Sequence, residues 1–400
     1  MKDIQAIVAS HKLYAPKQSV AGKETELITL GQTIEYVPYK KCDGDSPRDE
    51  LIEKAWKLKS SSIGRASCKP NKVILDGISI GEFISGKYRI NEFIGSGGLG
   101  VIYSATDKDG NKVAIKALKG GEIPEVQMQR FLREASVMAF LDHKNIVSLI
   151  DVGIDKDRPY IVMEYVGNGT FMDVVKLYHK GYIDLSTALH YITDLCQALD
   201  IVHADGRFVH RDLSPANILL SSETTNSMDR RVERNVIKLA DFGLTHVSDA
   251  SKMLTDFGQI MGTVRFSPVI DMVGGNIDAR SDLYSVGILL YYLVTKELPF
   301  DDPEGGDSHK GVISICDQHL YKSPDFDLID KRLPSTLVWL MKKLLEKNPD
   351  NRPQKAKEVE SMLREIAVGL AASTSLIVTP MFNPQAEIFT GQKEDNELTV

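Results

Sequence analysis

Short runs of β-branched and aromatic residues give the first clear pattern along the chain. Turn-forming Gly, Asp and Asn residues separate these runs, and one stretch with a helical period lies among them. Such an arrangement predicts antiparallel strands accompanied by a single helix. In chain order, the runs and the helical stretch cover residues 88–94, 100–106, 112–118, 131–138, 147–152 and 160–166.

Beyond Gly169 the period of the apolar residues becomes that of helices. Residues 185–203 place apolar side chains on one broad face, whereas 286–294 is almost continuously apolar and predicts a helix buried on all sides. Two further amphipathic helices are expected at 337–345 and 359–367. The resulting prediction is an α+β fold, with a small β-rich lobe followed by a larger α-helical lobe.

The two ends of the chain show no strong period. We expect residues 1–85 to form an N-terminal extension that is partly ordered at best. The two lobes are expected at 86–166 and 167–370. Residues 371–400 are polar, with an acidic stretch near their end, and predict a flexible tail.

Composition and charge narrow the classes of function. The chain has 400 residues, with 48 Lys and Arg against 55 Asp and Glu and a net charge of −7, so nothing favours nucleic-acid binding. Its first residues do not resemble a signal peptide, and no apolar run reaches the roughly 20 residues that span a membrane. The 4 cysteines match no zinc or disulfide spacing. We therefore expect a cytoplasmic protein without stable membrane association.

A glycine-rich segment between the first two predicted strands is the first chemical signal. Gly95, Gly97 and Gly100 follow the order G-x-G-x-x-G, and without a Cβ the backbone can approach phosphate oxygens closely. A dinucleotide-binding fingerprint needs a helix directly after this loop, but a strand is predicted here. Taken alone, the segment fits a phosphate-binding loop and an ordinary glycine-rich hairpin equally well.

A lysine within an apolar strand is the second signal. Lys116 ends the apolar run that begins at Val113, and a buried ammonium group is costly unless a carboxylate pairs with it. Glu134, on the predicted helix that follows, is the candidate partner. The alternative is a lysine on an edge strand that reaches water, together with a solvent-facing glutamate.

Acidic and amide side chains in two neighbouring segments give the strongest signal. Asp212 lies five residues before Asn217, and Asp241 ends the next predicted strand, directly before Phe242 and Gly243. Three oxygen-bearing side chains would thus meet at one place. Phosphoryl transfer needs such a set, because one carboxylate must lie near the attacking hydroxyl while hard oxygen ligands bind Mg²⁺.

Together these segments resemble the signature of the protein kinase family. The sequence contains G-x-G-x-x-G, V-A-I-K, H-R-D-L-x-x-x-N and D-F-G in that order. The resemblance extends over residues 88–366 and is strongest to bacterial members of the eukaryotic-type Ser/Thr kinases. It implies the bilobal kinase fold, with a small antiparallel β-rich lobe that carries one helix.

The resemblance also implies ATP and Mg²⁺ as cofactors and a role for each residue of the motifs. Lys116, oriented by Glu134, would hold the α- and β-phosphates, and Asp212 would orient the substrate hydroxyl. Asn217 and Asp241 would bind Mg²⁺. In the large lobe, Asp282 would hold a stack that includes Met138, His210 and Phe242. The other residues implied in ATP binding are Ile94, Gly95, Ser96, Gly97, Gly98, Gly100, Ile102, Ala114, Met163, Glu164, Val166 and Leu219.

Two positions depart from the family pattern. Ser214 stands where the Ser/Thr branch usually has a lysine, and losing a cation from such a site can cost about 10³-fold in rate. We therefore expect a working but slower enzyme. Val269 stands where the family has a glutamate that pairs with a late arginine, which is Arg352 in this chain. Our hypothesis is that Asp271 takes this pairing.

Two further segments carry hypotheses about regulation. Residues 221–235 form a polar insert, for which we expect a solvated hairpin extension, with a docking site for a partner as the alternative. The activation segment, between Asp241 and Pro268, contains the candidate phosphosites Ser251 and Thr255. Arg211 beside the catalytic aspartate could receive a phosphate from either of them.

The leading prediction is an ATP- and Mg²⁺-dependent kinase that phosphorylates Ser and Thr in protein substrates. It would autophosphorylate in its activation segment, which implies a transient homodimer. Tyrosine or dual specificity is one alternative, kept open by Ser214. A pseudokinase scaffold that binds partners is an alternative of another class, and the presence of Lys116, Asp212 and Asp241 argues against it.

Overall fold

A computed structural model describes most of the central part of the chain. The described residues are 78–96, 100–120, 123–206, 208–227, 230–242, 264–274, 277–302, 309–329 and 331–374. The expected extension as far as residue 77 and the tail beyond Thr374 lie outside them. So do Gly97, Gly98 and both phosphosite candidates, Ser251 and Thr255.

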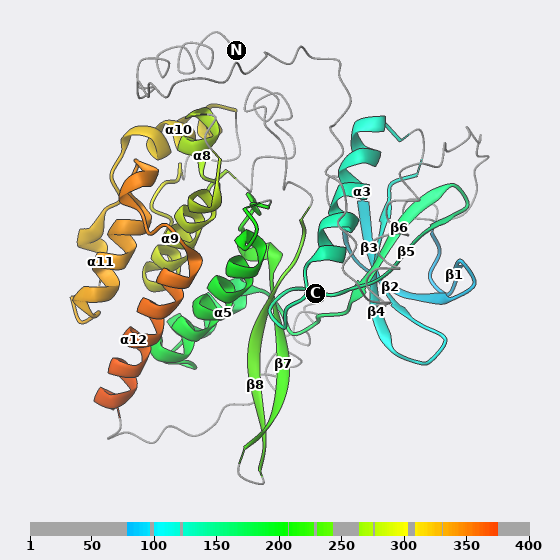
Figure 1. Ribbon diagram of the computed structural model, residues 1–400, viewed down its shortest axis with the longest axis horizontal. Helices are drawn as coiled ribbons and strands as arrows, with labels where there is room; N and C mark the ends of the chain where they lie inside the picture. The colour runs from blue at the N-terminus through cyan, green and yellow to red at the C-terminus, as the bar shows by residue number, and fades with distance from the viewer. Residues whose placement is uncertain are drawn as a thin grey trace, which may run out of the picture.

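An antiparallel sheet of six strands forms the first lobe, and α3 (Glu125–Phe140) lies beside it (Figure 1). Along β2, Tyr88 and Ile90 are buried while Arg89 is exposed, as the two-residue period of a strand requires. The strands expected at 88–94, 100–106 and 112–118 are confirmed. In sheet order the strands are β1 (Phe83–Ile84), β2 (Tyr88–Ser96), β3 (Gly100–Thr106), β4 (Lys112–Leu118), β6 (Arg158–Glu164) and β5 (Leu149–Asp155).

Helices dominate the second lobe, which lies beside the first one in Figure 1. The α+β prediction, with a β-rich lobe preceding a helical one, is thereby confirmed. Helix α12 continues to Thr374, past residue 370, where we expected the tail to begin. The helices are α4 (Phe171–His179), α5 (Leu185–His203), α8 (Val269–Gly274), α9 (Ala279–Thr295), α10 (His309–Tyr321), α11 (Ser335–Leu344) and α12 (Ala356–Thr374), and the 3-10 turns are η2 (Pro215–Asn217), η3 (Phe326–Leu328) and η4 (Pro349–Asn351).

Helix α9 runs through the centre of the large lobe. Its residues from Ser281 to Tyr291 are all buried, which confirms the expectation of a helix covered on every side. Gly287 allows α11 to approach, because a Cβ at this position would lie 2.8 Å from the Cβ of Leu344. The position of α9 matters for the site, since Asp282 lies in its first turn.

The polar insert forms a long hairpin, as the sequence analysis expected. β7 (Ile218–Ser227) and β8 (Arg230–Leu239) pair antiparallel from Ile218↔Leu239 to Ser227↔Arg230. Figure 1 shows the hairpin extending away from the helical lobe beside α5. Asn217 directly precedes β7 and Asp241 follows β8 after one residue, so the hairpin joins the two segments that carry the acidic side chains.

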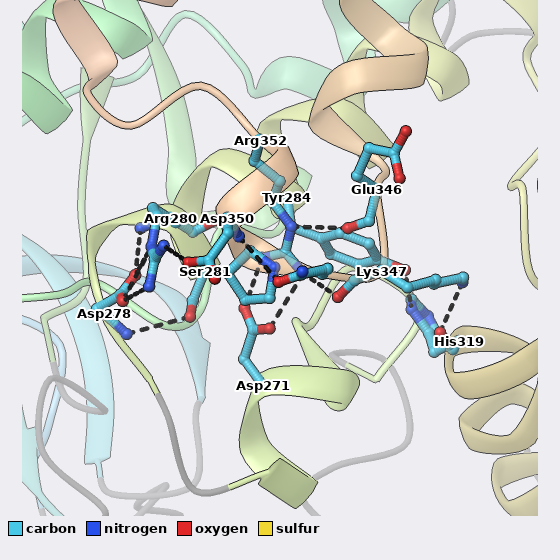
Figure 2. A network of polar contacts seen from close by, with 12 residues as sticks. Asp271, Asp278, Arg280, Ser281, Tyr284, His319, Glu346, Lys347, Asp350 and Arg352 are labelled. Carbon is cyan, nitrogen blue, oxygen red and sulfur yellow. Dashed lines mark hydrogen bonds and ion pairs between the residues drawn. The ribbon is translucent and has the colours of Figure 1, made fainter. Parts of the chain in front are cut away.

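A buried ion pair connects α8 to the loop that precedes α12 (Figure 2). The two terminal guanidinium nitrogens of Arg352 donate to Asp271, at 2.7 Å and 3.0 Å, and neither side chain is exposed by more than 1%. Arg352 also donates to the carbonyl oxygens of Glu346, Lys347 and Arg280. The hypothesis that Asp271 takes the pairing with Arg352 is therefore confirmed.

Val269, which stands where a glutamate was expected, lies in an apolar cluster. It is buried together with Val264, Val312 and Ile315. A carboxylate in this cluster would lose its hydration without a partner, whereas a valine contributes apolar contact. The end of the activation segment is thus held by apolar packing, and the ionic contact has moved to Asp271.

Among the residues that the structure describes, no helix is both long and apolar enough to cross a bilayer.

Replacing Asp271 with Ala should lower the free energy of unfolding by about 3–5 kcal/mol, because the buried charge of Arg352 would lose its partner. Chemical denaturation of the purified variant measures this change. The matched control is Asp350→Ala, which breaks a surface ion pair with Arg280 in which the Asp350 side chain is 79% exposed. The control should change stability by no more than about 1 kcal/mol. A charge-reversed Asp271→Lys variant with unchanged stability would contradict the assigned role.

Candidate active site

A buried lysine–glutamate pair lies at the centre of the small lobe. The Lys116 Nζ on β4 donates to both carboxylate oxygens of Glu134 on α3, at 2.7 Å and 2.8 Å. The two side chains are only 6% and 1% exposed. Burial by itself would lower the pKa of Lys116, but the charges of Glu134 and Asp241 and their hydrogen bonds together outweigh it, so the pKa is raised and the ammonium group persists.

The same lysine extends across to the segment that follows β8. Its Nζ lies 3.3 Å from Oδ1 of Asp241, whose side chain is 42% exposed. Asp241 has a φ of 60°, in the left-handed region that residues with a Cβ seldom adopt. One ammonium group thus contacts carboxylates from both lobes. The pairing of Lys116 with Glu134 was expected from the sequence, whereas the contact of Lys116 with Asp241 was not.

Asp212, Asn217 and Asp241 are brought together by the turn η2 and the base of the hairpin. The Asn217 side-chain amide donates to the main-chain oxygen and to Oδ2 of Asp212, both at 3.0 Å. The Ala240 N–H donates to the Asn217 carbonyl at 2.9 Å, which fixes Asp241 beside this turn. The three oxygen-bearing side chains predicted from the sequence are therefore neighbours.

The electrostatics of this cluster favour a cation. Burial raises the pKa of Asp212 to about 6, and the negative charge of Asp241 raises it too, while Asn217 and Lys116 oppose the shift. No group of three or more His, Cys, Asp or Glu side chains suited to a metal ion occurs among the residues that the structure describes. The donors available here are two carboxylates and one amide, which are hard oxygen ligands of the kind that Mg²⁺ takes alongside phosphate oxygens.

Asp282 holds the loop that carries Asp212. It is fully buried in α9 and accepts hydrogen bonds from the main-chain N–H groups of His210 and Arg211, both at 2.8 Å. Burial opposes its ionisation, yet the hydrogen bond from His203 lowers the pKa of Asp282. The ring of His210 packs against Phe242 with centroids 5.0 Å apart, so the expected stack is observed for these two side chains.

His203 is a contributor that the sequence analysis missed. It ends α5, and its Nε2 lies 2.8 Å from Oδ2 of Asp282. Another is Lys238 on β8, whose Nζ lies 3.0 Å from a carboxylate oxygen of Glu164 at the end of β6. Neither residue belongs to a short motif, because each contact joins segments that are distant in sequence.

The apolar residues expected around the adenine share one face of the sheet. Ile102 pairs with Lys116 across β3 and β4, and Ala114 pairs with Met163 across β4 and β6. Residues directly opposite each other in a sheet share a face, and so do residues two apart in one strand. Ile102, Ala114 and Met163 therefore lie on the same face as Lys116.

The remaining predicted ATP contacts surround this face. Ile94 and Gly95 lie near the end of β2, with Ile94 48% exposed, and Leu219 is the second residue of β7 on the other lobe. Gly100 allows a close approach of strands, because a Cβ there would lie 2.5 Å from the carbonyl oxygen of Ala117. Ser96 ends β2, Glu164 ends β6, and Val166 follows Glu164 in the connection between the lobes.

Comparison with known proteins agrees with this geometry. The model of the protein kinase domain matches residues 88–364. Among curated relatives, the probable serine/threonine-protein kinase CPE1738 of Clostridium perfringens is 33% identical over 72% of this chain and 39% of its own length. Serine/threonine-protein kinase PknB of Mycobacterium tuberculosis is 33% identical over 74% of this chain and 45% of its own.

A third relative, serine/threonine-protein kinase pkn2 of Myxococcus xanthus, is 31% identical over 79% of this chain and 36% of its own length. The chain thus spans less than half the length of these relatives. The similarity to bacterial Ser/Thr kinases expected from the motifs is confirmed. With the domain match, the sheet-and-helix order and the clustered Lys116, Asp212 and Asp241 in agreement, the chain belongs to the protein kinase family.

Proposed function

We propose that this protein is an ATP- and Mg²⁺-dependent protein kinase that transfers the γ-phosphate of ATP to Ser and Thr hydroxyls of proteins. The observation that carries the proposal is the position of Lys116, which contacts Glu134 at 2.7 Å and Asp241 at 3.3 Å. A kinase needs this lysine–glutamate pair and the metal-binding aspartate in place at the same time. The three side chains form one connected set.

Each residue of the set has a task in phosphoryl transfer. Lys116 would neutralise the α- and β-phosphates, and Glu134 would keep its ammonium group in position. Asp212 would orient the attacking hydroxyl and accept its proton, and its hydrogen bond from Asn217 fixes the carboxylate. Ile102, Ala114 and Met163 would cover the adenine from the sheet side, and Leu219 from the hairpin side.

Asn217 and Asp241 are the residues that would hold Mg²⁺. Repulsion from Asp241 already raises the pKa of Asp212, and a bound cation would relieve that repulsion. When bound, the metal supplies charge stabilisation to the phosphate oxygens. The protein's own part is to keep the two oxygen donors at a fixed separation through the Ala240–Asn217 hydrogen bond.

Ser and Thr are favoured as acceptors over Tyr by the relatives, whose names describe serine/threonine-protein kinases. Ser214 is the position that bears on the rate of phosphoryl transfer. It precedes η2, between Asp212 and Asn217, and is half-buried. A hydroxyl there cannot supply the positive charge that a lysine gives to the transferring phosphate.

Autophosphorylation in the activation segment is a second part of the proposal. Burial lowers the pKa of the Arg211 guanidinium, and the nearby charge of Arg133 on α3 lowers it further, although Asp282 raises it. Two guanidinium groups from different lobes thus repel each other, and a phosphate placed between them would remove that repulsion. Ser251 and Thr255 are the proposed hydroxyls that accept this phosphate from ATP and then carry it.

Incubating the full chain with labelled ATP, Mg²⁺ and a mixed protein substrate should give labelled phosphoserine and phosphothreonine after hydrolysis. The Asp241→Asn variant should give none, because it loses a metal-binding carboxylate. Asp109→Asn, in an exposed turn, is the matched control and should keep full activity. Label in both Asp241→Asn and the unaltered protein, or in neither, would contradict the proposed activity, and phosphotyrosine alone would reverse the choice of acceptor.

Replacing Ser214 with Lys should raise kcat by about tenfold or more, because the new ammonium group would lie next to the transferring phosphate. Ser214→Met supplies a chain of similar reach without the charge and should not raise kcat. Steady-state kinetics of the two variants with one protein substrate measure the effect. Equal rates for the Lys and Met variants would show that charge at this position does not limit phosphoryl transfer.

Phosphopeptide mapping of the active protein should find phosphate on Ser251 or Thr255. The double variant Ser251→Ala, Thr255→Ala should phosphorylate a protein substrate several-fold more slowly than the unaltered chain, because the phosphate that would order the activation segment could not be added. Active protein in which neither residue carries phosphate would eliminate this part of the proposal without affecting the assigned transfer reaction.

A further inference from the structure

Lys238 makes a contact to which the proposed chemistry assigns no task. It lies on β8 in the large lobe, and its Nζ is 3.0 Å from Oε2 of Glu164, which ends β6 in the small lobe. The lysine side chain is 13% exposed and the glutamate side chain 30% exposed, so both charges are largely removed from water. A charge in such a place needs a partner of opposite sign, so the pairing fixes where the two side chains lie.

The same carboxylate oxygen of Glu164 is also bound to the small lobe. Oε2 accepts a hydrogen bond from the Ser148 N–H at 3.4 Å, and the Glu164 N–H donates to the Ser148 carbonyl oxygen at 2.9 Å. Ser148 directly precedes β5, so main chain and side chain of Glu164 are both held at this edge of its own sheet. One oxygen atom thus joins a small-lobe main chain to a large-lobe cation.

The main chain on either side of Lys238 is fixed as well. The Val147 N–H donates to the Leu239 carbonyl at 2.9 Å, and the Leu239 N–H donates to the Asn145 carbonyl at 2.8 Å. The Asn145 side-chain amide donates to the carbonyl of Ile237 at 2.9 Å. Because Lys238 lies between Ile237 and Leu239, its ammonium group is presented to Glu164 from a backbone of fixed position.

The Lys238 side chain also lies beside a residue proposed to contact the nucleotide. Leu219 is directly opposite Lys238 across the hairpin, and directly opposite residues share a face of the sheet. Leu219 would cover the adenine from the large lobe, and Glu164 and Val166 would contact it from the connection between the lobes. One face of the hairpin base therefore carries a proposed adenine contact and the cation that reaches Glu164.

Tyr165, the next residue of this connection, is held from the small lobe. The Nζ of Lys112 on β4 lies 3.9 Å from the centre of the Tyr165 ring and 3.5 Å from a carboxylate oxygen of Glu92. The Lys112 side chain is 48% exposed, and contacts of exposed cations are weak. The better protected pair of Lys238 and Glu164 is thus the stronger constraint on the connection.

We propose that Lys238 is a positioning residue for ATP, which holds Glu164 so that the main chain from Glu164 to Val166 keeps the shape that binds adenine. The inference rests on the proposed ATP-dependent function and adds to it a residue outside the motifs. Lys238 acts through Glu164 and touches neither the metal nor the reacting atoms. Adenine binding is the same before and during phosphoryl transfer, so loss of this positioning weakens ATP binding without slowing the transfer.

Replacing Lys238 with Met keeps the length of the side chain and removes its charge. The variant should have a KM for ATP about five- to tenfold above that of the unaltered chain, with kcat changed by less than about twofold. Lys238→Arg keeps the charge and should bring the KM back to within about twofold of the unaltered value. Steady-state kinetics at a saturating concentration of one protein substrate measure both constants.

Glu164→Gln tests whether Lys238 acts through this carboxylate. Glu164→Gln alone should raise the KM for ATP as much as Lys238→Met does, and the double variant should raise it no further, because both changes remove the same contact. The Glu164→Gln variant also carries the prediction if Lys238→Met does not fold, which thermal unfolding of each variant reveals.

The matched control is Lys144→Met. Lys144 also pairs across the lobes, since its Nζ lies 3.9 Å from a carboxylate oxygen of Glu223 on β7, but its side chain is 48% exposed and the pair does not involve the connection. If ion pairs with the hairpin merely fastened the lobes together, this variant and Lys238→Met would have similar kinetics. We expect Lys144→Met to keep the KM for ATP within about twofold.

Calorimetric titration with ADP and Mg²⁺ measures nucleotide binding without phosphoryl transfer. The Kd of Lys238→Met should again be about five- to tenfold above that of the unaltered chain. Equal Kd values, additive effects in the double variant, or a changed kcat with an unchanged KM would each overturn the role of Lys238 and leave the proposed kinase activity in place. An unaltered chain that binds ADP but transfers no phosphate would contradict the kinase activity, and the two Kd values would still decide the role of Lys238.

Discussion

The fold and the candidate site both depend on a buried ammonium group that must remain paired. Lys116 cannot be moved into an apolar strand without a carboxylate close by, because unpaired burial of a charge costs several kcal/mol. Glu134 meets that need from α3 and Asp241 adds to it from the other lobe. The need to pair the Lys116 ammonium group thus constrains how α3, the six-stranded sheet and the large lobe lie relative to one another. The geometry for phosphate binding follows from the same constraint.

Much of this arrangement is readable from the sequence, because it rests on local patterns. The helix at Leu185–His203 has the bounds that its apolar period predicts, and the strand at 112–118 coincides with β4. The pairing of Lys116 with Glu134 follows from the cost of burying a lysine. The hairpin at 221–235 follows from two strand-like ends joined by polar residues. In each case the physical cause lies within a short stretch of chain.

Contacts between distant segments could not be read in the same way. His203 stands at the end of an amphipathic helix, where nothing local distinguishes a solvent-facing histidine from one that donates to Asp282. Lys238 and Glu164 lie in different lobes and in different sheets, and they become neighbours only when the two lobes pack together. Asp271 was expected to pair with Arg352 only because a family pattern left that arginine without its usual glutamate. Nothing in the sequence pattern indicated that α9 and α11 approach each other closely at Gly287.

The pairing of Asp271 with Arg352 has a consequence for how the chain is made. The two residues are 81 positions apart, and the arginine comes near the end of the large lobe. A ribosome adds about 5–20 residues per second, so the aspartate emerges several seconds before its partner exists. During that interval, burial of the Asp271 carboxylate on α8 would cost free energy, because no guanidinium group is there to pair with it. The large lobe should therefore complete its packing late in translation, and truncation before Arg352 should yield nascent chains that chaperones retain.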